Sequence, residues 1–137
     1  MRQPVEELVL SREAWGRVVR HARAVYPDEA VGVLGGTAHG RVTSVAPLPN
    51  LARRGAFLAD PRAQFEAERG FAQLQLMAVA AYHSHPDGTP TLSQSDRVLA
   101  QPSLIQLVVA VGRRGRLDMR AYHVASGVRE VPVQIEG

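Results

Sequence analysis

Two histidines one residue apart, His83 and His85, are the side chains whose types and spacing most directly suggest chemistry. They follow the apolar run Leu76–Ala81, which is typical of a buried strand. If that strand continues through residue 85, its period of two places both imidazoles on one face and Ser84 on the other. Two imidazole nitrogens on one face can converge on a single metal ion.

A carboxylate follows the histidines at a distance that a loop could close. Pro and Gly residues predict a loop over 86–90, and Ser93 is a plausible N-cap of a short helix that contains Asp96. Ser93 and Asp96 then lie one turn apart on one face, so a loop that folds back could bring the Asp96 carboxylate to the same ion. Two imidazoles and one carboxylate leave the fourth position of zinc to water, which is the catalytic pattern.

The remaining histidines carry no such pattern. His21, His39 and His123 are interpreted as surface or hydrogen-bonded side chains, and an HxH pair alone also occurs outside metal sites. HxHP followed by SxxD, with residues 86–95 between His85 and Asp96, is a far more specific arrangement.

These motifs resemble the signature of the JAMM, or MPN-plus, metalloprotease family: an early glutamate, then HxHP, then SxxD. The early glutamate falls on Glu29, within the segment 26–36. The resemblance runs from about Leu8 to Val124 and implies an α/β domain with a mixed central β-sheet flanked by helices, the cytidine-deaminase-like architecture of that family. Further positions similar to bacterial and archaeal members are Pro47-Leu48-Pro49-Asn50, Phe57 and Asp60-Pro61.

The resemblance also implies roles at the site. His83, His85 and Asp96 would hold Zn²⁺, Glu29 would act as general base, and Ser93 would donate a hydrogen bond to the developing oxyanion. From position alone, Glu29 before the apolar run Ala30–Leu34 is interpreted as a solvated loop residue, and the resemblance reverses that interpretation.

The implied reaction is hydrolysis of a peptide or isopeptide bond after the C-terminal Gly-Gly of a ubiquitin-like or β-grasp sulfur-carrier protein. A noncatalytic MPN-type scaffold is the alternative, although every motif position is filled. A nucleoside deaminase is excluded because its zinc site requires cysteine, and the chain has none. One departure is Thr91-Leu92, where family members often place Pro before the motif serine.

Composition restricts the classes of protein further. The chain has 137 residues, a net charge of +3 and a sequence pI near 10.2, and every basic residue is Arg. The arginines are scattered and aromatic residues are few, so a solvated surface or an acidic protein partner is expected rather than nucleic acid. No apolar stretch predicts a membrane span or signal peptide, and we expect one cytoplasmic domain, 1–137, as a monomer or homodimer.

The periodicity of the chain predicts the elements that position the site. The loop Asn50–Asp60, which carries Arg53-Arg54-Gly55, is expected to lie over the site and to be mobile. A helix beginning at Asp60-Pro61 is expected to bury both Phe65 and Phe71. The other expected elements are a strand over Val5–Leu10, a helix from Ser11 to Tyr26, a hairpin from Gly35 to Gly40, and strands over Arg41–Pro47, Leu104–Val111, Leu117–Val124 and Val128–Ile135.

Overall fold

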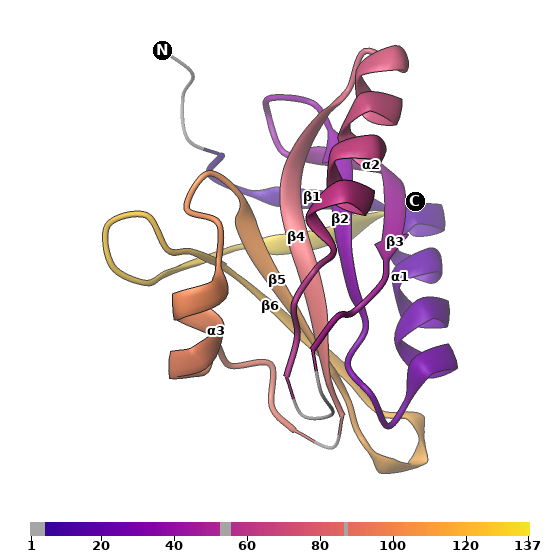
Figure 1. The fold of residues 1–137 in the computed structure, drawn as a ribbon, viewed down its shortest axis with the longest axis vertical. Helices are drawn as coiled ribbons and strands as arrows, with labels where there is room; N and C mark the ends of the chain where they lie inside the picture. Colours follow the sequence, from indigo (N-terminus) through magenta and orange to yellow (C-terminus); the bar gives the residue numbers. More distant parts are fainter. Residues whose placement is uncertain (1–4, 53–55, 87) are drawn as a thin grey trace.

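A twisted eight-stranded sheet with helices on both faces forms the centre of the molecule (Figure 1). The structure, a computed structural model, describes residues 5–52, 56–86 and 88–137. The mixed α/β architecture predicted from the sequence is confirmed. Its elements are β1 Leu8–Ser11, α1 Arg12–Val25, β2 Val31–Gly36, β3 Arg41–Leu48, α2 Pro61–Gln73, β4 Met77–Pro86, α3 Gln94–Leu99, β5 Ile105–Val111, a 3₁₀ turn Arg113–Gly115, β6 Leu117–His123, β7 Arg129–Val131 and β8 Val133–Glu136.

The centre of the sheet is built from strands that are buried and mostly apolar, with Gln106 as a buried polar residue in β5. The strand order is β7-β6-β5-β4-β2-β3-β1-β8, and every residue of β2 and of β5 is buried. β4 lies between them, antiparallel to β2 and parallel to β5. Strands covered on both faces are expected to be continuously apolar. β4 departs from this at its end, where His83, Ser84 and His85 follow Tyr82.

Helix α1 covers one face of the sheet. Its N-cap is Ser11, whose hydroxyl accepts a hydrogen bond from the Ala14 amide, as the sequence predicts. The stripe Ala14, Val18, Val19 and Ala22 is buried. The main core forms between this stripe and side chains such as Leu10, Leu34 and Leu107.

Helix α2 covers part of the opposite face, with Asp60 as its N-cap and Pro61 in its first turn. Phe71 is buried against the sheet and packs with Val33 and Leu48. The prediction that Phe65 is also a core residue is wrong, because its side chain is 62% exposed. The helix meets the sheet along a narrow stripe, so only the C-terminal phenylalanine reaches it.

The C-terminal segment departs from the single strand predicted over Val128–Ile135. It breaks at Pro132 into β7, which pairs with β6, and β8, which pairs with β1 at the other end of the strand order. Proline has no amide proton for a strand ladder, while its carbonyl still accepts a hydrogen bond from the Leu8 amide at 2.9 Å. One short segment therefore supplies the strands at both ends of the strand order.

Membrane-spanning helices were also considered. Among the residues that the structure describes, no helix has the length and apolar character needed to cross a bilayer.

Gly70 offers a direct test of local helix stability. It lies exposed within α2, and a Cβ added there would meet no atom within 4 Å. We expect Gly70→Ala to raise the free energy of unfolding by about 0.5–1 kcal/mol, because alanine loses less backbone entropy in a helix. Urea denaturation measures this change. Gly16→Ala in α1 is the comparison, since its Cβ would lie 3.3 Å from the Arg20 side chain. A destabilised Gly70→Ala protein would contradict the assignment of residue 70 to the exposed face of α2.

Candidate metal centre

The two histidines lie at the C-terminal end of β4, where the strand leaves the core. The strand continues through residue 86, as the sequence argument requires, so His83 and His85 share one face. Tyr82 and Ser84 point to the other face, toward α1: the Tyr82 hydroxyl lies 2.7 Å from Nδ1 of His21. His83 is 1% exposed, whereas His85 is partly open to solvent.

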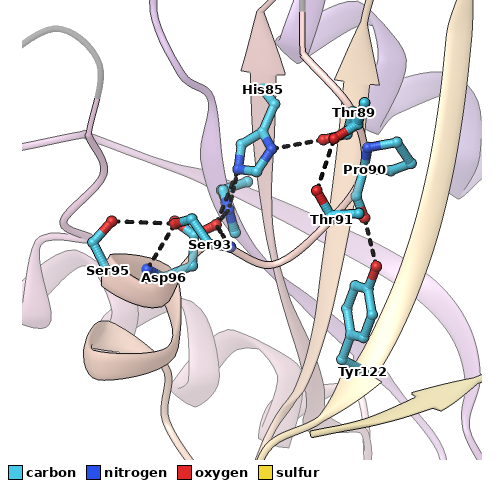
Figure 2. A network of polar contacts seen from close by, with 9 residues as sticks. His85, Thr89, Pro90, Thr91, Ser93, Ser95, Asp96 and Tyr122 are labelled. Carbon is cyan, nitrogen blue, oxygen red and sulfur yellow. Dashed lines mark hydrogen bonds and ion pairs between the residues drawn. The ribbon is translucent and has the colours of Figure 1, made fainter.

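Three polar atoms from these histidines and Asp96 form a small triangle. The Nε2 atoms of His83 and His85 are 3.1 Å apart. Oδ2 of Asp96 lies 3.2 Å from the first nitrogen and 3.1 Å from the second. Figure 2 shows Asp96, at the start of α3, facing His85 across the loop that joins β4 to α3. The structure therefore brings together the three side chains that the sequence predicted to converge.

The distances in this triangle suit coordination of a metal ion better than hydrogen bonding among three protonated groups. Ligand atoms of a tetrahedral zinc site with bonds of 2.0–2.1 Å are about 3.3 Å apart. Both Nε2 atoms contact the same carboxylate oxygen and lie 3.1 Å from each other. If both carried protons, the two protons would point toward each other and repel. A cation between the three atoms removes this conflict. The residues present therefore fit a divalent metal.

Hydrogen bonds outside the triangle fix the orientation of its members. Nδ1 of His85 lies 2.8 Å from the Thr89 carbonyl oxygen. When Nδ1 donates its proton there, Nε2 presents a lone pair toward the triangle. The following residue, Pro90, accepts a hydrogen bond from the buried Tyr122 hydroxyl at 2.8 Å, which ties the loop to β6 (Figure 2).

Asp96 is held by the start of its own helix. Ser93 and Asp96 form a capping box, in which the Ser93 hydroxyl accepts from the Asp96 amide at 3.1 Å and Asp96 Oδ2 accepts from the Ser93 amide at 2.9 Å. The predicted N-cap is confirmed. The Ser93 hydroxyl also lies 3.1 Å from that of Ser95, and both line the groove beside the triangle.

Glu29 approaches the triangle from the start of β2. Its carboxylate lies with the imidazole nitrogens of His83 and His85 in a group whose atoms are all within 4.8 Å of one another. The residue is 8% exposed. Burial raises its pKa above the ordinary value, the neighbouring Asp96 raises it further, and His85 opposes this. Glu29 is therefore buried, and the interpretation from its sequence position as a solvated loop residue is wrong.

The pKa shifts of the two imidazoles differ in direction, because burial dominates at His83 whereas Asp96 and the Thr89 carbonyl outweigh burial at His85 and raise its pKa. Burial disfavours ionisation of Asp96, but the close contacts with the His83 and His85 rings and the hydrogen bond from the Ser93 amide outweigh it and hold the pKa of this carboxyl well below its ordinary value. Burial lowers the pKa of His83, which favours the neutral imidazole that ligates metals.

The backbone around Glu29 is fixed by two side chains. The Asn50 amide donates to the carbonyls of Glu29 and Ala56, each at 3.1 Å. Its oxygen accepts from the amides of Ala52 and Leu58 at 3.0 and 2.9 Å. All four of its main bonding positions are used.

Ser84 fixes the same strand end from the opposite face. Its buried hydroxyl accepts from the Ala30 amide at 2.7 Å, and its own amide donates to the Ala30 carbonyl at 3.0 Å. The strand period predicts that Ser84 faces away from the two histidines, but it does not predict this partner, which lies 54 residues away.

The loop Asn50–Asp60 bears on the site through Phe57. This ring stacks on His83 with centroids 4.1 Å apart and planes 15° from parallel. The loop is anchored by Asn50, by the Leu51 amide to the Leu58 carbonyl at 2.8 Å, and by a bridge between Asn50 and Ala59. Its predicted segment Arg53-Arg54-Gly55 lies outside the described residues.

A groove of about 530 Å³ opens beside the triangle, hereafter the catalytic groove. Glu29, His85, Ser93 and Asp96 line it together with apolar and small side chains from both flanking loops. An extended chain in this groove would place one of its carbonyl groups near the triangle, the Glu29 carboxylate and the Ser93 hydroxyl. That is the arrangement needed for metal-assisted hydrolysis.

Comparison with known proteins agrees with this geometry. The family model Prok-JAB, prokaryotic homologs of the JAB domain, matches residues 11–125. The chain belongs to this family, which confirms the resemblance seen in the motifs.

Two curated relatives cover nearly the whole chain. The CysO-cysteine peptidase of Mycobacterium tuberculosis is 31% identical over 132 residues, covering 93% of this chain and 90% of that protein. The desampylase of Haloferax volcanii is 31% identical over 137 residues, covering 94% and 96%.

Solved structures give the same fold. A protein from Desulfitobacterium hafniense superposes with a TM-score of 0.86 at 29% identity, covering 94% of this chain and 92% of its own. A JAB1/MPN domain protein from Archaeoglobus fulgidus has a TM-score of 0.61 at 18% identity, covering 94% and 100%.

Asn50 provides a test of how the site is supported. We expect Asn50→Ala to lower the free energy of unfolding by about 1 kcal/mol, because it removes four side-chain hydrogen bonds, of which those to Glu29 and Ala52 are partly buried. Hydrogen exchange followed by NMR should show lost protection at the Ala52 and Leu58 amides. Asn50→Asp is the matched control, since its carboxylate still accepts from both amides. Unchanged protection in Asn50→Ala would show that the loop is held by other contacts.

Proposed function

We propose that this chain is a zinc-dependent peptidase or isopeptidase that cleaves after the C-terminal Gly-Gly of a ubiquitin-like or sulfur-carrier protein. The observation that carries the proposal is the buried triangle of His83, His85 and Asp96, with its edges of 3.1–3.2 Å. Family membership and the names of the two relatives support it.

The three triangle residues would hold the ion. Zinc is proposed because two imidazoles and a carboxylate suit it, although iron, cobalt or manganese accept the same ligands. Bound there, zinc would supply Lewis acidity, which lowers the pKa of a coordinated water and polarises the carbonyl of a bound peptide.

The other side chains would handle protons and charge. Glu29 would take the proton of the attacking water and deliver it to the leaving amine, a role that its burial and raised pKa favour. The Ser93 hydroxyl would donate to the developing oxyanion, since its acceptor side already faces the Asp96 amide. Ser84 and Asn50 would keep Glu29 at its place beside the triangle.

The substrate assignment follows from the relatives and from the groove. The relatives' names point to a carrier joined to cysteine and to a protein modifier removed from its target. Both reactions release an amine from the C-terminus of a small carrier. An extended glycine-rich tail would suit the catalytic groove, because glycine allows the close backbone approach that a narrow site needs. We further propose that residues 1–137 act as one cytoplasmic domain, as a monomer or homodimer.

Metal content tests the proposed site directly. We expect protein purified without chelators or a histidine tag to hold about one zinc per chain, and Asp96→Ala to lose it, because one of three ligands is removed. Elemental analysis measures this ratio. Asp28→Ala is the control, since that exposed carboxylate lies outside the triangle. Absence of metal after zinc is added back would favour the noncatalytic scaffold.

Glu29→Gln separates metal binding from catalysis. We expect this variant to retain its zinc but to hydrolyse a diglycine-tailed carrier about 10²–10⁴-fold more slowly, because the amide cannot accept the proton. Single-turnover cleavage together with elemental analysis measures both properties. If Glu29→Gln lost its metal as Asp96→Ala does, Glu29 would be a ligand instead. Cleavage at the wild-type rate would show that another group is the base.

A further inference from the structure

A second groove, of about 390 Å³, lies on the α1 side of the same end of the sheet. Arginine side chains and a tyrosine dominate it, and none of its described lining residues is acidic. We call it the cationic groove, and its lining residues are Arg23, Tyr26, Val111, Gly112, Arg114 and Gly115.

The cationic groove is a built feature of the fold. The Arg23 guanidinium donates to the Gly115 carbonyl at 3.1 Å, which joins the end of α1 to the turn between β5 and β6. Arg114 adopts the left-handed conformation, with φ of 65°, an uncommon state for a residue with a long side chain. The turn is closed by hydrogen bonds from Gly112 to Arg116 and from Gly115 to Gly112.

The arginines of this groove differ from others on the surface. Within the described part of the chain, neither Arg23 nor Arg114 has a carboxylate at ion-pair distance, and the same holds for the exposed Arg17 and Arg20 on α1. Elsewhere arginines do pair with carboxylates: Arg41 with Glu136, Arg69 with Glu66, Arg120 with Glu130 and Arg129 with Glu6. Among the described residues, these four arginines therefore form a set along α1 and the adjoining turn that has no ion pair with a described carboxylate.

The cationic groove adjoins the catalytic groove around the strand ends. Pro86 lines the catalytic groove and Val111 lines the cationic groove, and these two residues are direct partners in the parallel pairing of β4 with β5. Figure 1 shows the end of α1 and the β5–β6 turn at the lower end of the sheet, where β4 also ends. A protein bound with its tail in one groove can therefore reach the other with its folded body.

We propose that the cationic groove binds an acidic patch on the folded body of the substrate carrier while its tail lies in the catalytic groove. This inference rests on the proposed function. The arginines of the groove and the carboxylates of an acidic patch have opposite charges. Guanidinium groups form directional hydrogen bonds to carboxylates, and a cluster of charges of one sign accelerates association with a partner of the opposite sign. The groove would thus contribute to carrier binding without touching the reacting atoms.

A binding experiment tests the groove separately from catalysis. The probe is a fluorescein-labelled peptide of eight glutamates, with an octaglutamine peptide as the neutral comparison, followed by fluorescence anisotropy at low ionic strength. The test variant is Arg23→Gln with Arg114→Asn, because asparagine tolerates the left-handed backbone at residue 114. The matched control is Arg12→Gln with Arg62→Gln, which removes the same charge from exposed positions outside the groove. Circular dichroism checks that both variants are folded.

We expect the wild type and the control variant to bind the acidic peptide alike, and the groove variant to bind it about tenfold more weakly. Equal weakening in both variants would overturn the proposal, since net charge alone would then explain binding. Tighter binding of a single-stranded oligonucleotide of equal charge, lost in the groove variant, would also overturn it in favour of nucleic acid.

Cleavage assays with two substrates then distinguish a failure of the proposed function from a failure of the proposed role of the cationic groove. A short peptide ending in a Gly-Gly amide bond tests the proposed reaction alone, and both variants should cleave it at the wild-type rate. For an acidic diglycine-tailed carrier, the groove variant should show a KM raised about tenfold with kcat unchanged. If the short peptide is not cleaved by any form, the proposed function fails. If it is cleaved but the KM for the carrier does not change, the groove has no part in carrier binding.

Discussion

The convergence of two imidazole nitrogens and one carboxylate oxygen within 3.1–3.2 Å of one another is the constraint on which the site depends. Such a cluster is costly in a buried position unless a cation or a shared proton compensates it. The sheet holds the cluster together by placing His83 and His85 on β4, a strand that pairs with β2 on one side and β5 on the other. A fixed backbone keeps the ligand atoms together before any ion binds.

Support for this cluster comes from residues that never touch it. Asn50 and Ser84 hold the backbone around Glu29 from opposite faces of the sheet. Tyr122 holds the loop between His85 and Asp96 through the Pro90 carbonyl. Each uses a single side chain to join segments far apart in sequence, so loss of one would move a chemical group without removing it. The precision of the site is thus distributed over β2, β4 and β6.

The two grooves give the end of the sheet an asymmetric charge. The catalytic groove carries Glu29 and Asp96, whereas the cationic groove carries Arg23 and Arg114. They adjoin at the paired ends of β4 and β5, where Pro86 of one groove is the strand partner of Val111 of the other. An acidic body and a neutral, flexible tail on one partner would meet both surfaces at once.

The sequence by itself determined the elements and most of the candidate site, because those signals are local. The period of two in a strand aligned His83 with His85, and the capping preference of serine placed the helix that carries Asp96. Tertiary structure decided what depends on distant partners: the burial of Glu29, the four hydrogen bonds of Asn50, the exposure of Phe65, and the split at Pro132 that serves both ends of the sheet. Propensity and spacing contain no information about which surface a side chain will meet, and only the packed fold supplies it.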